Sequence, residues 1–145
     1  MLMKTILLVD DDTPLMKMYV QALEEKGLKI VHKTSADEAL EFAANDPGHV
    51  DILVLDLMMD PGEAFKDKET FGGLATGFFL RNSMRQYYSK QPIIFLTNLN
   101  LTEILTHFAL GPHERLEHKF NHGPFDFAKL VCDILQGAES GSDSN

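Results

Sequence analysis

Short apolar runs alternate along this chain with longer amphipathic segments, and this alternation restricts the fold more than any other feature. Four runs have the length of strands, at Thr5–Val9, Lys29–His32, Asp51–Leu55 and Ile93–Leu96, and a weaker fifth covers Leu116–Lys119. A run that is apolar rather than alternating is typical of a strand covered on both faces. Strands that alternate with helices favour a parallel sheet with helices on both sides.

The segments between the runs carry helix signals. Asp12 or Thr13 can cap a first helix that has Pro14 at its start and ends at Gly27, and Ser35 can cap the next. We expect helices over residues 13–26, 35–45, 74–88, 100–111 and 127–135. Right-handed crossovers then leave few topologies. We therefore predict an α/β fold, a five-stranded parallel sheet in the flavodoxin-like order 2-1-3-4-5.

Size and composition predict one domain. The chain has 145 residues, of which 1–136 form the expected domain and Gly137–Asn145, small and polar, an expected disordered tail. A net charge of −9 argues against non-specific nucleic-acid binding. The lone Cys132 fits a reducing compartment, and the sequence has neither a signal peptide nor a run of membrane-spanning length. We therefore expect a cytoplasmic protein.

Reactive side chains follow the predicted strands. Asp10 and Asp11 follow the first strand, Asp56 the third, Thr97 the fourth, and Lys119 lies at the end of the fifth. Because these strands are neighbours in the predicted order, the side chains converge on one edge of the sheet. Clustered carboxylates repel unless a cation compensates them, and an all-oxygen site suits Mg²⁺. A carboxylate in such a place can accept a phosphoryl group.

Five motifs in this order resemble one known family. They are Ile6–Asp12, Asp51–Met59, Gly72–Arg81, Ile93–Thr97 and Lys119. Together they resemble the receiver domain of bacterial two-component response regulators, in the single-domain form typified by chemotaxis regulators. The similarity extends from Ile6 to Leu135, apart from an insert.

The resemblance implies a role for each matching residue. It makes Asp56 the phosphoacceptor. It implies that Mg²⁺ binds to Asp10, Asp11, Asp56 and the backbone carbonyl of Met58, and that Thr97 and Lys119 bind the phosphoryl oxygens. It also implies a histidine kinase or phosphotransfer protein as phosphodonor and a downstream protein as target, with no nucleic acid and no membrane. Without a DNA-binding domain, we expect the output to be protein–protein contact. Such a domain assists its own phosphorylation and dephosphorylation but is not an enzyme acting on an external substrate.

Several positions depart from the family pattern. Asn98 replaces the small residue that usually follows the switch threonine, and Phe120 replaces the proline that usually follows the lysine. Leu116 stands at the switch position where the family often has an aromatic residue. An insert of mixed charge, about residues 60–72, starts four residues after Asp56. It is either a functional surface or a tolerated insertion.

Two other functions compete with this interpretation. The first is a receiver-like docking module that is never phosphorylated. The second is a phosphatase of the haloacid-dehalogenase type, with Asp10 as nucleophile and Asp12 as acid/base. That family needs a late acidic pair at a strand end, whereas Asp126 and Asp133 fall in the last predicted helix. It also leaves Asp56 without a role.

Overall fold

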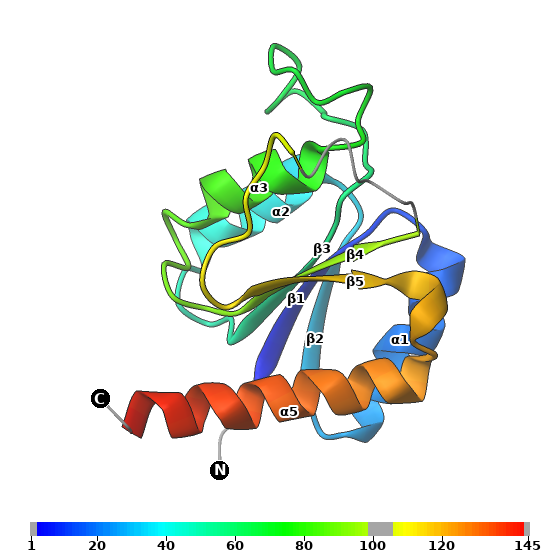
Figure 1. Ribbon diagram of the computed structural model, residues 1–145, viewed down its shortest axis with the longest axis vertical. Helices are drawn as coiled ribbons and strands as arrows, with labels where there is room; N and C mark the ends of the chain where they lie inside the picture. Colours follow the sequence, from blue (N-terminus) through cyan, green and yellow to red (C-terminus); the bar gives the residue numbers. More distant parts are fainter. Residues whose placement is uncertain (1–2, 99–105, 144–145) are drawn as a thin grey trace.

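The five strands form one parallel sheet in the order β2-β1-β3-β4-β5 (Figure 1). The structure, a computed structural model, describes residues 3–98 and 106–143. The strands are β1 (Thr5–Val9), β2 (Lys29–Lys33), β3 (Ile52–Asp56), β4 (Ile93–Thr97) and β5 (Glu114–His118). Every neighbouring pair in the sheet is parallel. The predicted fold class and strand order are confirmed.

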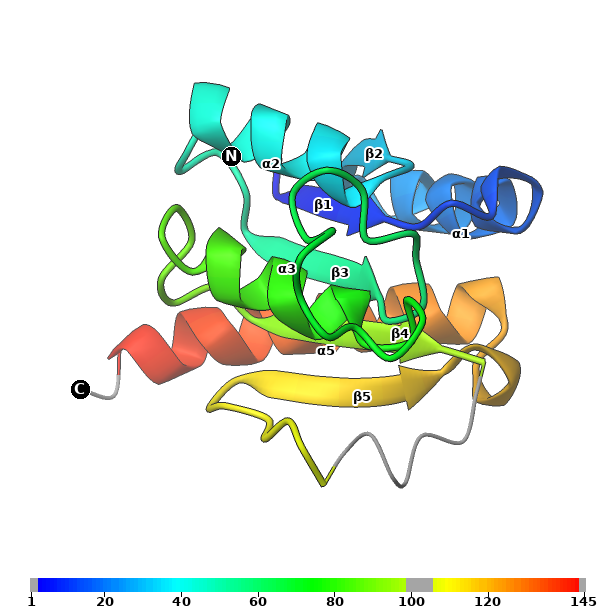
Figure 2. The same cartoon turned by 90° about the horizontal axis from the view of Figure 1, so that it is seen from above.

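Helices cover both faces of the sheet. They are α1 (Thr13–Glu25), α2 (Ala36–Asn45), α3 (Thr76–Met84) and α5 (Pro124–Asp143), and a short 3₁₀ helix, η1, covers Lys119–Asn121. Figures 1 and 2 show α2 and α3 on one side of the sheet and α1 and α5 on the other. No helix in the described part of the chain has the length and hydropathy that crossing a membrane requires.

The apolar strands supply both layers of the core. On β1, Ile6 and Leu8 pack in the cluster formed with α1 and α5, whereas Leu7 and Val9 pack in the cluster formed with α2 and α3. All four side chains are buried. Successive strand residues point to opposite faces, so a strand covered on both sides must be apolar at every position. The continuous apolar runs of the sequence have this origin.

The first two helices begin where the sequence predicts. The Asp12 carboxylate accepts the Leu15 N–H at 3.2 Å, and the Ser35 hydroxyl accepts the Glu38 N–H at 3.1 Å. Each bond satisfies a backbone N–H that has no partner within the helix. Asp10 therefore lies in the short connection between β1 and α1.

Two strands are displaced from their predicted bounds. Strand β3 starts one residue later than predicted, at Ile52. Asp51 comes directly before it, where its carboxylate accepts the Thr5 N–H at 2.8 Å and its own N–H donates to the Thr5 carbonyl at 2.8 Å. Strand β5 starts two residues earlier than predicted, at Glu114, whose carboxylate is held by Arg81 of α3 and by Arg85, which follows α3. The strand also ends one residue earlier than predicted, at His118, so Lys119 lies in η1, directly after the strand.

Three helical predictions also need correction. Helix α3 is shorter than predicted, because the Arg85 guanidinium donates to the carbonyls of Tyr88 and Gln91 and holds the chain in a turn after Met84. Residues 106–111 are turn and coil rather than helix, and the predicted cap at Asn100 lies outside the described residues. Helix α5 continues to Asp143, so the backbone of residues 137–143 is helical where a disordered tail is predicted. Extending an existing helix adds a hydrogen bond for each residue, without a new nucleation step.

The insert, residues 60–72, is a series of turns that projects beyond α2 and α3 in Figure 1 and is attached to the domain by a few contacts. The Asp37 carboxylate of α2 accepts the backbone N–H groups of Glu63 at 2.9 Å and Ala64 at 3.0 Å. Phe65 is only 5% exposed, and its ring centroid lies 6.0 Å from that of Phe79 on α3. Phe71 lies against Phe108 with a centroid distance of 6.3 Å. Both aromatic side chains of the insert therefore contact the domain itself.

Candidate functional site

The structure brings the predicted site residues to one edge of the sheet. Asp10 follows β1, Asp56 ends β3, Thr97 ends β4 and Lys119 follows β5. The parallel register keeps the carboxyl ends of these strands level with one another. Residues far apart in the sequence therefore form one cluster, here called the acidic rim: Asp10, Asp11, Asp56, Thr97 and Lys119.

Three carboxylates of the acidic rim lie within reach of a single cation. One oxygen from each of Asp10, Asp11 and Asp56 lies within 4.8 Å of the others. Asp10 is fully buried and Asp56 is 5% exposed, whereas Asp11 is exposed. Backbone bonds hold the buried pair: Asp12 N–H donates to Asp10 at 2.9 Å, and Met58 N–H donates to Asp56 at 3.3 Å.

Lys119 supplies a buried positive charge to this cluster. Its Nζ lies 2.9 Å from Oδ2 of Asp10 and 3.7 Å from Oδ2 of Asp56. Burial alone would lower the pKa of Lys119, but the attraction of Asp56 and Asp10 outweighs burial and raises it. The side chain is therefore an ammonium at neutral pH and bridges the two acids.

The same surroundings make ionisation of Asp56 costly. Burial, followed by the negative charge of Asp10, raises the pKa of Asp56 to about 7, although Lys119 and the Met58 N–H oppose the shift. The ordinary value for this carboxyl is 3.8. Three acids with one lysine among them thus leave an excess of negative charge at this edge.

This donor set fits a magnesium ion. Mg²⁺ prefers carboxylate oxygens, and it commonly binds through a few carboxylates while retaining waters and substrate phosphate. The close carboxylates of Asp10, Asp11 and Asp56 match that preference, and a divalent cation would offset both the burial and the repulsion by Asp10 that raise the pKa of Asp56. The exposure of Asp11 leaves one side of the cluster open to solvent.

Thr97 belongs to the acidic rim, and Asn98 follows it in the sequence. Thr97 is 1% exposed at the end of β4, the neighbour of the strand that ends in Asp56. Asn98, the unusual residue after it, is exposed. Its side chain is therefore not packed into the buried part of the rim. Phe120 follows Lys119 within η1, and the described part of the chain has no cis peptide bond.

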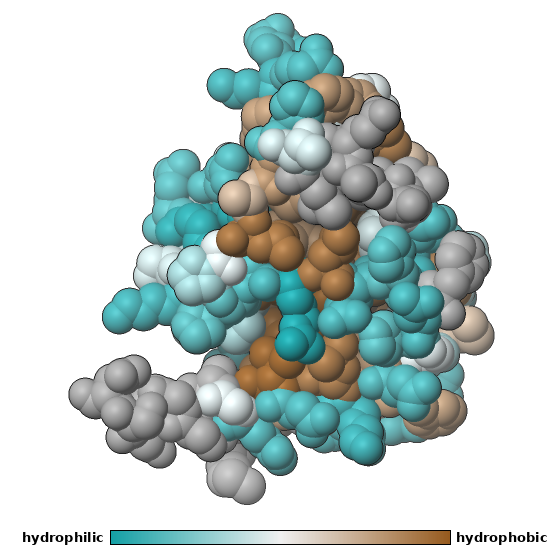
Figure 3. Space-filling view, viewed as in Figure 1, coloured by the Kyte–Doolittle hydropathy of each residue, from teal (hydrophilic) through white to brown (hydrophobic). Residues whose placement is uncertain are grey.

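Leu116 belongs to the core rather than to the rim. It is half-buried on β5, pairs in register with Phe95, and packs against the cluster on the α3 side of the sheet. The face around β5 is largely hydrophilic, with apolar residues gathered above and below its middle (Figure 3). Leu116 has no aromatic ring whose rotation could follow a movement of Thr97.

Two residues at the start of α3 support the loop after Asp56, and the sequence analysis did not single them out. A Cβ on Gly77 would lie 2.4 Å from the Asp56 carbonyl oxygen, so only glycine permits this approach. Gly77 N–H donates to Leu57 O at 3.0 Å, and the Thr76 hydroxyl donates to Met59 O at 2.7 Å. A glycine in the first turn of a predicted helix is the signal that could have indicated this contact.

Two further side chains contact the backbone of the rim. His32 Nε2 lies 2.9 Å from the Asp10 carbonyl oxygen, and the Tyr19 hydroxyl reaches the turn that contains Lys119. Sequence reasoning missed both. His32 lies within a strand and Tyr19 at a core position of a helix, and neither position distinguishes such a residue from one that only packs.

Comparison with known proteins identifies the family. The family model described as response regulator receiver domain matches residues 6–121. The transcriptional regulatory protein YvrH of Bacillus subtilis (strain 168) is 33% identical over 129 residues, which cover 88% of this chain and 47% of that protein. The chain thus spans about half the length of this curated relative.

Solved structures show the same fold. A CheY-like receiver domain protein from Methanospirillum hungatei JF-1 has a TM-score of 0.76 at 21% identity and covers 97% of this chain and 99% of its own. The chemotaxis protein CheY4 of Vibrio cholerae has a TM-score of 0.70 at 21% identity, with 92% and 99% covered. The family model, the curated relative and the fold agree, and the chain belongs to the response regulator receiver domain family.

Proposed function

We propose that this receiver domain accepts a phosphoryl group on Asp56 with the assistance of Mg²⁺. The observation that carries the proposal is the cluster of Asp10, Asp11 and Asp56 beside the Lys119 ammonium. The family supports phosphoryl-accepting two-component signalling in general terms. The arrangement of the acidic rim supports Asp56 as acceptor, because it is the buried carboxylate that ends β3 and that Lys119 also approaches.

The transfer step needs an ionised Asp56. A carboxylate oxygen of Asp56 forms a bond to the phosphorus of a phosphohistidine or a small acyl phosphate. The bond from phosphorus to the donor's nitrogen or oxygen breaks, and the leaving group keeps its electron pair. The product is an aspartyl phosphate. Water can later attack the phosphorus, which releases phosphate and restores the carboxylate.

Residues of the acidic rim offset the negative charge of the incoming phosphoryl oxygens. Lys119 donates from its ammonium to a phosphoryl oxygen, and the Thr97 hydroxyl donates to another. Asp10, Asp11, Asp56 and the Met58 carbonyl would hold Mg²⁺, which supplies positive charge for the phosphoryl oxygens when it is bound. Asp12, by contrast, caps α1 and has no part in the step.

The proposed partners follow from this chemistry. A histidine kinase or a phosphotransfer protein supplies the phosphoryl group, and a downstream protein reads the phosphorylated state through direct contact. The protein is in this account a cytoplasmic signalling module rather than an enzyme acting on external substrates. Family membership gives no support to the phosphatase alternative, whose nucleophile would be Asp10. An unphosphorylated docking module is the alternative that the next experiment tests.

Intact-mass measurement after incubation with acetyl phosphate tests the proposal. We expect one phosphoryl group on the wild-type protein with Mg²⁺ and none on Asp56→Ala. Asp67→Asn, which removes an exposed carboxylate in the insert, is the matched control and should be modified like wild type. An unmodified wild-type protein would support the docking module. Equal modification of wild type and Asp56→Ala would place the acceptor elsewhere.

A further inference from the structure

Lys119 depends for its position on a short turn. It begins η1, Lys119–Asn121, which joins β5 to the start of α5. A 3₁₀ turn of this length has poor hydrogen-bond geometry of its own. Residues 119–123 contain no proline whose ring would restrict the backbone. Contacts from outside the turn are therefore needed to keep the lysine directed at the acids.

The Tyr19 hydroxyl makes such contacts at both ends of the turn. Its oxygen lies 3.2 Å from the carbonyl oxygen of Lys119 and 2.9 Å from that of His122. A tyrosine hydroxyl has a single proton, which the two carbonyls share in a bifurcated hydrogen bond. The His122 ring adds a contact to Glu117 of β5 at 2.8 Å. The hydroxyl thus links the residue that carries the ammonium to the residue where the turn ends.

Tyr19 is itself held firmly. It lies on α1, is 3% exposed, and meets the ring of Phe127 edge to face with a centroid distance of 5.5 Å. Burial raises the pKa of Tyr19 above its ordinary value, so the hydroxyl keeps its proton at neutral pH and remains a donor. Phe127 belongs to α5, so the same side chain also fixes α1 against the helix that follows the turn.

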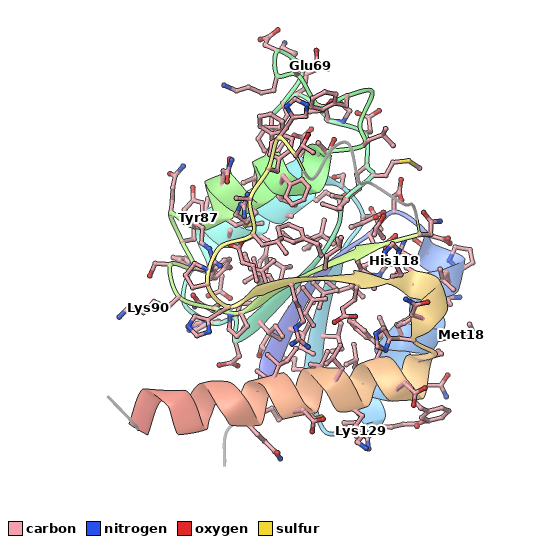
Figure 4. All side chains as sticks on the ribbon, in the orientation of Figure 1. Met18, Glu69, Tyr87, Lys90, His118 and Lys129 are labelled. Carbon is pink, nitrogen blue, oxygen red and sulfur yellow. The ribbon has the colours of Figure 1, made fainter. Side chains whose placement is uncertain are left out.

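Helix α1 therefore connects the acids of the rim that follow β1 with Lys119, the rim residue that follows β5. Its first residue, Thr13, follows Asp10–Asp12, and Tyr19, six residues further on, holds the backbone of Lys119. In Figure 4 His118, at the end of β5, and Met18, the neighbour of Tyr19 on α1, lie on the same side of the molecule. The distance between the acids and the lysine is thus set through one rigid element.

We propose that Tyr19 is a positioning residue for Lys119: its hydroxyl fixes the turn after β5 so that the Lys119 ammonium faces Asp56 during phosphoryl transfer. The proposal rests on the function proposed above. It assigns Tyr19 no contact with the phosphoryl group or the metal. Loss of the hydroxyl should loosen residues 119–122 without removing the ring that packs against Phe127.

The variant Tyr19→Phe tests this proposal, and the chain offers a matched control. Tyr88 is fully buried, and its hydroxyl has no hydrogen-bond partner among the described residues. Tyr88→Phe therefore removes a buried hydroxyl without removing a bond. Its neighbour Tyr87 lies in Figure 4 at the opposite end of the sheet from His118.

The rate of phosphorylation by acetyl phosphate with Mg²⁺ is measured in two backgrounds, wild type and Lys119→Met. Tyr19→Phe should slow the reaction roughly three- to tenfold in the wild-type background, the effect of losing one hydrogen bond. In the Lys119→Met background, Tyr19→Phe should not slow the reaction further, because the ammonium that Tyr19 positions is absent. Tyr88→Phe should match its parent in both. An equal loss from Tyr19→Phe in both backgrounds, or no loss in wild type, would overturn the proposal.

Amide hydrogen exchange decides the positioning claim without any phosphoryl transfer. Exchange at residues 119–123 should become faster in Tyr19→Phe and stay unchanged in Tyr88→Phe, while β4 keeps its protection in both. Unchanged exchange at 119–123 in Tyr19→Phe would overturn the proposal even if wild type is phosphorylated. Faster exchange with an unmodified wild-type protein would refute the proposed function and leave the role of Tyr19 in holding the turn supported.

Discussion

Lys119 Nζ lies 2.9 Å from Oδ2 of Asp10, so the lysine is paired with an acid of the candidate metal site. The same nitrogen lies 3.7 Å from Asp56. The ammonium, the metal-binding carboxylates and the acceptor therefore form one electrostatic unit, in which a change at one residue alters the charge balance at the others. The predictions on Asp11 and Asp56 follow from this coupling.

Asp11→Asn should weaken Mg²⁺ binding by about tenfold or more, because it removes a negative charge and a ligand oxygen from the site. Asp11 is exposed, so the fold should be unaffected. Asp12→Asn is the control: it removes a neighbouring charge, and asparagine caps a helix as well as aspartate does. Calorimetric titration with Mg²⁺ measures both. Equal affinities of Asp11→Asn and wild type would mean that the metal does not bind at Asp11.

Asp56→Asn should stabilise the protein at pH 8 in the absence of Mg²⁺. Burial and Asp10 raise the pKa of Asp56 to about 7, above the ordinary 3.8, so the folded state holds a proton that the unfolded state has lost. Wild-type stability should therefore fall as the pH rises between these values, whereas the asparagine variant lacks this loss. The gain in melting temperature should shrink at pH 4 and also when Mg²⁺ is added to both proteins. A gain that is independent of pH would contradict the raised pKa.

Glu114→Gln should destabilise the fold by about 3 kcal/mol at pH 7, because it leaves Arg81 and Arg85 without their buried partner. Burial alone would raise the pKa of Glu114, but the Gly111 N–H together with Arg85 and Arg81 holds it below its usual value. This stabilisation is present above the ordinary pKa of 4.5 and is lost as the pH falls through the lower, folded value. Urea unfolding at pH 7 and pH 3 measures the difference, which should shrink at pH 3.

An exposed ion pair provides the comparison for Glu114. Glu63 pairs with Lys66 on the insert, where both side chains are mostly exposed. Glu63→Gln should change the free energy of unfolding by less than about 0.5 kcal/mol. A similarly small effect of Glu114→Gln would show that the arginines find other partners and that the pairing does not hold β5 against α3.

Asp37→Ala should free the insert from α2. The Asp37 carboxylate accepts the N–H groups of Glu63 and Ala64, so those two amides should exchange slowly in wild type and much faster in the variant. Asp67→Ala, an exposed acid within the insert, should leave their exchange unchanged. Rapid exchange of both amides already in wild type would instead fit a loosely attached insertion.

The topology and the acidic rim were predictable because they depend on local patterns. Apolar runs marked the strands, and Asp10, Asp56 and Thr97 stand at strand ends, where a parallel sheet gathers side chains. The bounds of β5 were not predictable, since Glu114 starts the strand only because Arg81 and Arg85 hold its carboxylate.

The contacts made by Tyr19 and Asp37 were also not predictable, because each joins segments that are distant in the sequence. Tyr19 fits the apolar stripe of α1, and the sequence alone does not show that its hydroxyl meets a turn 100 residues away. Asp37 belongs to the first turn of α2, where acids are common, and its bonds to the insert depend on how the two segments meet in space. Patterns of neighbouring residues predict helices and strands, whereas contacts of this kind form only when the helices, strands and loops pack together.

Chemical mapping of the phosphorylated residue tests the central claim most directly. The wild-type protein is treated with acetyl phosphate and Mg²⁺, and borohydride then reduces the aspartyl phosphate to homoserine, which peptide mass spectrometry locates in the sequence. We expect homoserine at position 56 alone. Homoserine at position 10, where the phosphatase alternative puts its nucleophile, or unmodified aspartate throughout would contradict it.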